Sequence, residues 1–149
     1  MSVESLFREG FLKNIPPSRE RAEKSLKVAE KYLSEAKQTM KIGVFEMAII
    51  AAYNSAFHSS RAILFADGIG ERAHFAIYEY LKEKHGNFGQ ALLNAFDMYR
   101  KLRHSVAYGL DTKVGKKDAE SIVEFAEELL EKVRNYLKIP SSEKEGNAP

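Results

Sequence analysis

The stretch YRKLRHSVAYG at residues 99–109 gathers cations, an imidazole and phenols near the end of an expected helix. Arg100, His104 and Tyr108 follow one another at steps of four, so a continuous helix places them on one face, flanked by Arg103. Arginine presents a planar fork that matches phosphate oxygens, histidine exchanges a proton near neutral pH, and tyrosine adds a hydroxyl and a stacking ring. This face is therefore predicted to bind a phosphate group.

A simpler explanation of the cations stays open. Basic residues in the last turn of a helix interact favourably with the helix dipole, and Gly109 is typical of a residue that ends a helix. The dipole accounts for the cations but not for the neighbouring histidine and tyrosine. The sequence therefore leaves two interpretations, a helix end stabilised by its own dipole and a phosphate-binding site.

A second group of candidate residues lies in the segment VFEMAIIAAYNSAFHSSRAILFADG, residues 44–68, where apolar and small residues surround nearly the whole expected helix. Tyr53, Phe57 and Arg61 are spaced by four residues, and His58 precedes Arg61 by three. The helix is predicted to be buried on most sides, with Arg61 closing a polar seam. A buried guanidinium without an anion is strongly unfavourable, so this arginine needs a partner.

Two partners for Arg61 agree with the sequence. A carboxylate such as Asp67 or Asp97 could meet it and make a structural ion pair. Alternatively, the guanidinium faces a space that is open to water and phosphate. The spacing of residues does not decide between these interpretations.

Composition limits the chemistry that the chain can perform. Its 149 residues include no cysteine, which excludes disulfides and thiolate chemistry and is typical of a reducing cytoplasm. A net charge of +2 is too small for indiscriminate nucleic-acid binding, so an anion site must come from local arrangement. No known nucleotide-loop or metal motif occurs, and Glu71 with His74 is the only pair spaced as in di-iron bundles. We expect neither a metal nor a cofactor.

The hydrophobic pattern predicts an all-α protein that folds as an up-and-down antiparallel bundle of four to five helices. We expect a single domain over residues 1–139, with a short amphipathic helix over 2–13, a helical core over 18–138 and a flexible C-terminal tail over 140–149. Ser18 is the expected N-cap of the first long helix, and Gly43 is expected to interrupt the pattern after it. The last helix is expected over about 116–137.

The N-terminal segment MSVESLFREGFLKNIPP carries Glu4, Arg8 and Glu9 and has no long apolar run. It therefore resembles neither a signal peptide nor a membrane span. We expect a cytoplasmic protein that does not contact a membrane.

Three stretches of the sequence resemble the HEPN family (higher eukaryotes and prokaryotes nucleotide-binding domains), in particular its small stand-alone prokaryotic members. They are AIIAAYNSAFHSSRAILFADG, GERAHFAIYEYL and LRHSVAYG, and the resemblance covers residues from about 18 to 138. It implies a helical bundle that binds a nucleotide or RNA. The residues it assigns to binding are Arg61, His58, Arg100, Tyr53 and His74, and those it assigns to a candidate catalytic set are Arg103, His104 and Tyr108.

The last of these stretches departs from the family's ribonuclease motif, an arginine and a polar residue followed by a histidine four to six positions after the arginine. Arg103 and His104 match its beginning, but Tyr108 stands five positions after the arginine, and no histidine falls in that window. A phenol with a pKa of about 10 is a poor base at pH 7. The resemblance therefore leaves open a metal-independent ribonuclease with an incomplete motif and a protein that only binds RNA.

The resemblance also implies partners. Family members commonly form homodimers with the two motif copies facing one cleft, and many small members pair with a minimal nucleotidyltransferase in a toxin–antitoxin-like system. An alternative is a non-catalytic interaction module that binds this nucleotidyltransferase or is modified by it on Tyr108. A small-molecule or metal enzyme is a third interpretation, which the few carboxylate and histidine pairs do not favour.

Overall fold

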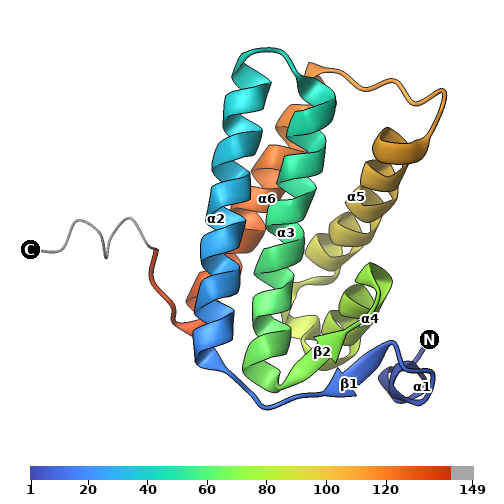
Figure 1. Ribbon diagram of the computed structural model, residues 1–149, viewed down its shortest axis with the longest axis vertical. Helices are drawn as coiled ribbons and strands as arrows, with labels where there is room; N and C mark the ends of the chain where they lie inside the picture. The colour runs from blue at the N-terminus through green and yellow to red at the C-terminus, as the bar shows by residue number, and fades with distance from the viewer. Residues whose placement is uncertain (142–149) are drawn as a thin grey trace, which may run out of the picture.

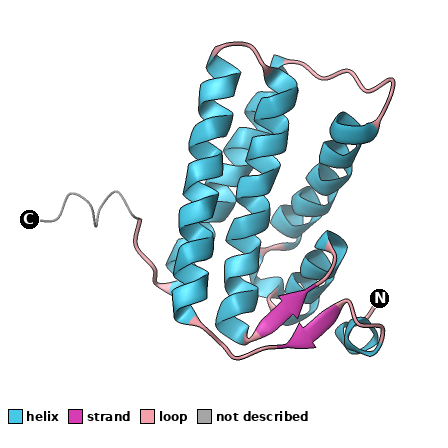
Figure 2. Ribbon diagram, in the orientation of Figure 1, coloured by secondary structure: helices cyan, strands magenta, loops and turns pink. Residues whose placement is uncertain are grey.

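The computed structural model describes residues 1–141 of the chain. Its elements in chain order are α1 (Val3–Arg8), β1 (Leu12–Asn14), α2 (Arg19–Lys41), α3 (Phe45–Asp67), β2 (Ile69–Glu71), α4 (His74–Lys84), a 3-10 turn η1 (Gly86–Phe88), α5 (Gln90–Tyr108) and α6 (Lys116–Leu137). Long helices dominate the fold, and the two strands form a small sheet at one end (Figures 1 and 2). The prediction of an all-α antiparallel bundle is confirmed.

Helices α2 and α3 form a closely packed antiparallel pair. The Ser25 hydroxyl donates to the carbonyl of His58 at 2.7 Å, and the Ser55 hydroxyl donates to the carbonyl of Ala29 at 2.8 Å. Small buried side chains between the helices let the backbones approach this closely. Helix α6 packs against both, because its apolar stripe from Ala119 to Val133 is buried.

The long helices begin and end where the local sequence favours it. Ser18 caps α2, as predicted, because its side chain accepts a hydrogen bond from the N–H of Arg21 at 3.0 Å. Gly43 adopts a positive φ in the turn between α2 and α3. Helix α6 extends from Lys116 to Leu137, the predicted range.

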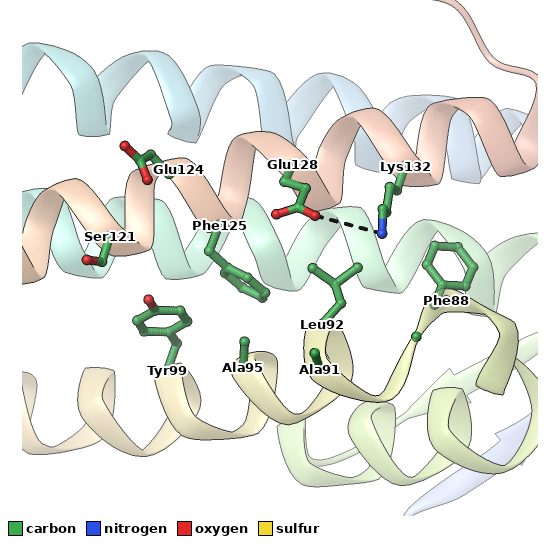
Figure 3. A pocket seen from close by; sticks show the side chains of 11 residues that line it. Phe88, Ala91, Leu92, Ala95, Tyr99, Ser121, Glu124, Phe125, Glu128 and Lys132 are labelled. Atoms are coloured by element: carbon green, nitrogen blue, oxygen red, sulfur yellow. Dashed lines mark ion pairs between the residues drawn. The ribbon is translucent and has the colours of Figure 1, made fainter.

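Helix α5 is buried most deeply in its N-terminal half. Its buried side chains are Leu92, Leu93 and Phe96, and no residue after Phe96 is fully buried in this helix. Figure 1 shows α5 inclined away from α3 toward its C-terminal end. A groove of about 450 Å³ lies between α5 and α6 (Figure 3).

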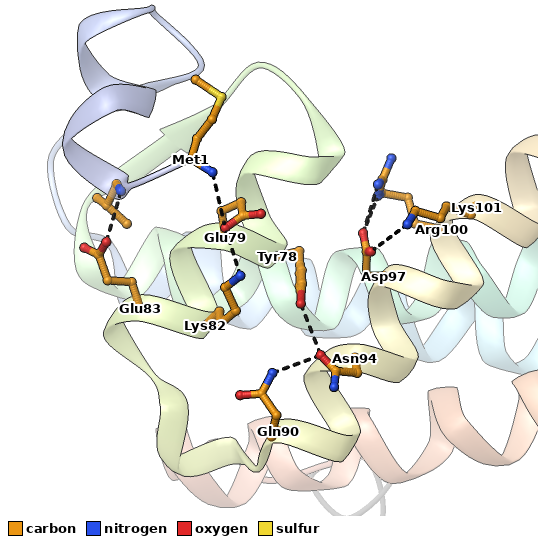
Figure 4. A network of polar contacts seen from close by, with 11 residues as sticks. Met1, Tyr78, Glu79, Lys82, Glu83, Gln90, Asn94, Asp97, Arg100 and Lys101 are labelled. Atoms are coloured by element: carbon orange, nitrogen blue, oxygen red, sulfur yellow. Dashed lines mark hydrogen bonds and ion pairs between the residues drawn. The ribbon is translucent and has the colours of Figure 1, made fainter.

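The prediction of an N-terminal helix over residues 2–13 is wrong beyond residue 8. Gly10 has a φ of 81°, which ends the helix, and Leu12–Asn14 then pairs with Ile69–Glu71 as an antiparallel strand. The strands escaped prediction because three residues are too few to display alternation. Helix α1 packs near α4, where the N–H of Val3 donates to Glu83 (Figure 4).

The predicted flexible tail over 140–149 lies almost wholly outside the described residues, which end at residue 141. None of the described helices combines the length and the apolar character that crossing a bilayer requires.

Candidate functional site

His74, the first residue of α4, lies among aromatic side chains of α3. Its ring stacks on Phe57 with a centroid separation of 4.1 Å and on Tyr53 with a separation of 5.8 Å. The Tyr53 oxygen lies 3.0 Å from Nδ1 of His74. The side chains of Tyr53, Phe57, His74 and the three arginines that surround them, Arg61, Arg100 and Arg103, are called the His74 cluster below.

The charge states within the cluster follow from burial and from the arginines. Burial, and then Arg103, Arg100 and Arg61, lower the pKa of His74 from 6.5, so its imidazole is neutral at pH 7. Burial also raises the pKa of Tyr53 above its usual 10. We therefore assign the Tyr53 hydroxyl as the donor and Nδ1 of His74 as the acceptor, which leaves the imidazole proton on Nε2.

Arg103 is the cation of the cluster that lacks an anionic partner among the described residues. Its guanidinium lies 5.9 Å from the ring centroid of Tyr53, which is a cation–π contact. Its Nε is buried and makes no hydrogen bond with any described residue. A buried donor that is left unpaired is unfavourable, and the described chain holds no carboxylate that an anion would have to displace from this guanidinium.

Arg100 has the partner that Arg103 lacks. Its Nε and Nη2 donate to Oδ1 of Asp97 at 3.1 and 2.9 Å, and Lys101 lies 3.3 Å from the other oxygen (Figure 4). Burial alone would raise the pKa of Asp97, but hydrogen bonds from Arg100 and Lys101 outweigh it and lower that pKa. Asp97 is therefore ionised and neutralises part of the local charge.

Arg61 meets a carboxylate, but neither of the two considered from the sequence. Its Nε lies 3.0 Å from Oε1 of Glu71 in β2, although the angle between the groups is too poor for a hydrogen bond. Its guanidinium also lies between the rings of Phe57 and Phe65, at 5.8 and 4.9 Å from their centroids. The expected partners are engaged elsewhere, because Asp97 binds Arg100 and Asp67 accepts hydrogen bonds from Tyr80 and His85.

His58 lies next to the cluster on the side of α3 that faces α2. Its ring stacks on Tyr32 with a centroid separation of 5.6 Å and an interplanar angle of 8°. Burial, and then the charges of Arg61 and His74, lower the pKa of His58 from 6.5 to about 4. This imidazole is therefore also neutral at pH 7.

The lowered pKa of His58 predicts a pH dependence of stability. The unfolded chain binds more protons than the folded one between pH 6.5 and about 4, so the free energy of unfolding falls as pH drops through this window. His58→Gln should flatten this fall relative to the wild type, as measured by urea unfolding at both ends of the window. A His58 ring that titrates near its ordinary pKa in an NMR experiment would contradict this prediction.

The structure divides the sequence-predicted residues into two groups. Arg103 lies in the cluster, but His104 and Tyr108 are exposed, and their rings contact each other with a centroid separation of 4.9 Å. The Tyr108 side chain is 66 % exposed. Within one copy of the chain, the guanidinium therefore does not share a hollow with the imidazole and the phenol that follow it on α5.

A second polar network was not anticipated from the sequence. Buried His85 lies 2.6 Å from Asp67 through Nε2 and 2.7 Å from the Tyr136 oxygen through Nδ1. It joins the ends of α3, α4 and α6, which are far apart in the chain. Within the described part of the chain, no group of three or more histidine, aspartate or glutamate side chains is arranged to hold a metal ion.

Comparison with known proteins agrees with this fold. The model of the HEPN domain family matches residues 22–136. A UPF0332 protein of Archaeoglobus fulgidus is 28 % identical over 118 residues, which cover 75 % of this chain and 91 % of the relative. A protein of Methanocaldococcus jannaschii named "Putative toxin MJ0605" is 28 % identical over 130 residues, which cover 80 % of this chain and 91 % of the relative. The chain belongs to the HEPN family.

Proposed function

We propose that this HEPN protein binds the phosphates of RNA at the His74 cluster. The observation that carries the proposal is the guanidinium of Arg103, whose buried Nε has no hydrogen-bond partner among the described residues while its face covers Tyr53. Arg61 and Arg100 reach the same cluster with their charges, and Glu71 and Asp97 offset two of the three cations. The cluster thus keeps one uncompensated positive charge.

A phosphate oxygen is the group that best completes this arrangement. The guanidinium fork of Arg103 matches phosphate geometry, and partial burial strengthens the attraction by lowering the local dielectric. The neutral His74 adds no competing charge and places a ring beside the anion. Aromatic rings next to cations are the means by which proteins hold single-stranded nucleic acids.

The chemistry of these residues favours a protein that binds RNA without cleaving it. Cleavage of RNA at the 2′-hydroxyl needs one group to remove a proton and another to protonate the leaving oxygen. The phenol that occupies the motif position, Tyr108, is a poor base at pH 7. It lies on the exposed face of α5 with His104, apart from Arg103.

We further propose a homodimer that acts as one member of a toxin–antitoxin-like pair with a minimal nucleotidyltransferase. Exposed apolar side chains in the middle of α5 and just after its C-terminal end support an interface there, since Met98 is 55 % exposed and Leu110 is fully exposed. A second copy that covered this end would bring the two Arg103 side chains toward one cleft. The toxin name of the Methanocaldococcus jannaschii relative supports the pairing.

The alternative is an interaction module that binds the nucleotidyltransferase without binding RNA. The exposed hydroxyl of Tyr108, next to the loop between α5 and α6, favours it because a partner enzyme could reach and modify this group. In this alternative the His74 cluster is a structural remnant.

Titration of a labelled single-stranded RNA with the wild-type protein separates the two functions. We expect saturable binding that weakens with salt, with a log–log slope of about −0.7 for each phosphate contact. The RNA should be recovered intact, and light scattering should give the mass of a dimer. Absence of RNA binding at low salt, together with a stable complex with the nucleotidyltransferase, would support the alternative instead.

A further inference from the structure

A shallow groove of about 420 Å³ runs between α2 and α3 on the far side of Arg61 from the His74 cluster. The α2 residues that line it include Arg21, Lys24 and Ser25, and the α3 residues are His58, Arg61 and Phe65. The antiparallel pairing of the helices fixes its position, because the N–H of Ser18 donates to the carbonyl of Phe65.

The charge of this groove differs from that of two other grooves between long helices of the bundle. Among the described residues that line it are three cations and no carboxylate. By contrast, Glu30, Glu127 and Glu131 line the groove between α2 and α6, and Glu124 and Glu128 line the groove between α5 and α6 (Figure 3). The α2–α3 groove is therefore the one of these three that attracts an anion.

Two of the three cations of the groove, Arg21 and Lys24, are available to a ligand. Within the described residues, Lys24 pairs with Glu20 alone, on the same exposed helix face at 3.2 Å, and such a pair contributes little stability. The side chain of Arg21 makes no ion pair with a described residue. Both side chains can therefore turn toward a phosphate with little loss.

Rings line the groove as well as charges. Phe65 supports the guanidinium of Arg61, and His58 extends the ring surface through its stacked contact with Tyr32. A ring surface beside exposed cations matches the way in which single-stranded nucleic acids are bound, with bases on the rings and phosphates on the cations.

Arg61 connects the groove to the His74 cluster. It touches Phe57 on the cluster side and Phe65 on the groove side, and its charge acts on both His74 and His58. Tyr53, beneath Arg103, and Phe65, near Arg21, are twelve residues apart on α3, which is about 18 Å at 1.5 Å per residue. A single nucleotide cannot span this distance.

We propose that the α2–α3 groove is a second phosphate subsite, and that the ligand is a single-stranded oligonucleotide that runs from Arg103 across Arg61 to Arg21 and Lys24. The inference rests on the proposed function, since it extends the strand already held at the His74 cluster. It excludes a free mononucleotide as the ligand that fills the whole site.

Two probes of different length test this extension. An oligoribonucleotide of about ten nucleotides reaches both subsites, whereas a 5′-phosphorylated dinucleotide reaches only one. We expect Arg21→Ala combined with Lys24→Ala to weaken binding of the long RNA by about tenfold and to leave binding of the dinucleotide within about twofold of the wild type. The matched control combines Lys116→Ala with Lys117→Ala, which removes two charges at the start of α6 and should change neither affinity.

The outcomes distinguish the second subsite from the first. If Arg103→Ala weakens both probes but the α2 double variant weakens neither, the groove is not a subsite and the proposed function stands. If the α6 control weakens binding of the long RNA as much as the α2 double variant does, the effect comes from diffuse charge, and the groove is again not a subsite. If Arg103→Ala changes neither probe, the proposed function fails, and the extension fails with it. Circular dichroism of each variant verifies that the helices are intact.

Discussion

Replacing Arg103 with alanine should weaken the binding of single-stranded RNA by about tenfold to a hundredfold. A charged hydrogen bond made in a partly desolvated site contributes about 1.5 to 3 kcal/mol, and each 1.4 kcal/mol corresponds to a factor of about ten in affinity. The Nε of Arg103 is buried, and no described residue accepts a hydrogen bond from it or pairs with the guanidinium, so an anion that reaches the guanidinium displaces no carboxylate. Removing the guanidinium also removes its contact with the Tyr53 ring.

Lys101→Ala is the matched control for this prediction. Lys101 lies two positions earlier on α5, carries the same charge and is 69 % exposed. It already pairs with Asp97, and exposed pairs of this kind contribute roughly 0 to 1 kcal/mol. We expect the lysine variant to bind RNA within about twofold of the wild type.

The measurement is an anisotropy titration of both variants at two salt concentrations. Added salt should weaken binding of the wild type and of the lysine variant in parallel, because the phosphates that they contact are the same. Equal losses for the two variants would mean that RNA is attracted by the general charge of α5 and not by the His74 cluster.

The sequence predicted which helices form better than it predicted which way their side chains face. The spacing of Arg100, His104 and Tyr108 defines one face of α5 but does not say whether that face turns toward the core. The buried residues of α5, which include Leu92 and Phe96, show which face of the helix turns toward the core. Arg103 stands seven residues after Phe96, two helical turns along the same face, so it turns inward while Tyr108 does not.

Ion partners were harder to predict, because they depend on contacts that are distant in the chain. The sequence predicted a buried Arg61, and the structure shows it partly buried. Its partner, Glu71, comes from a strand that the sequence did not reveal. The strand exists because β1, far earlier in the chain, pairs with it. The link of His85 to Asp67 and Tyr136 likewise spans three helices, and no local pattern marks it.

Gly68→Ala should lower the free energy of unfolding by about 3 kcal/mol, whereas Gly43→Ala should lower it by about 1 kcal/mol. Both glycines have a φ of +80°, and a side chain in this left-handed region costs roughly 1 to 2 kcal/mol. Only Gly68 is crowded, because a Cβ there would lie 2.7 Å from the carbonyl oxygen of Ile15, while nothing lies within 4 Å at Gly43. Relief of such a clash adds about 1 to 3 kcal/mol to the loss. Urea unfolding of both variants measures the difference, and equal losses would contradict it.

Because of where Gly68 lies, its replacement by alanine should affect RNA binding as well as stability. The N–H of Ile15 donates to the carbonyl of Gly68 at 2.9 Å, and β2 begins at the next residue and carries Glu71 to Arg61. A backbone shift that relieves the clash therefore displaces the carboxylate that holds this guanidinium between its rings. We expect the folded fraction of Gly68→Ala to bind the long RNA more weakly than Gly43→Ala does, because Arg61 is the cation shared by the His74 cluster and the α2–α3 groove. Identical affinities of the two folded variants would show that Glu71 does not position Arg61 for the ligand.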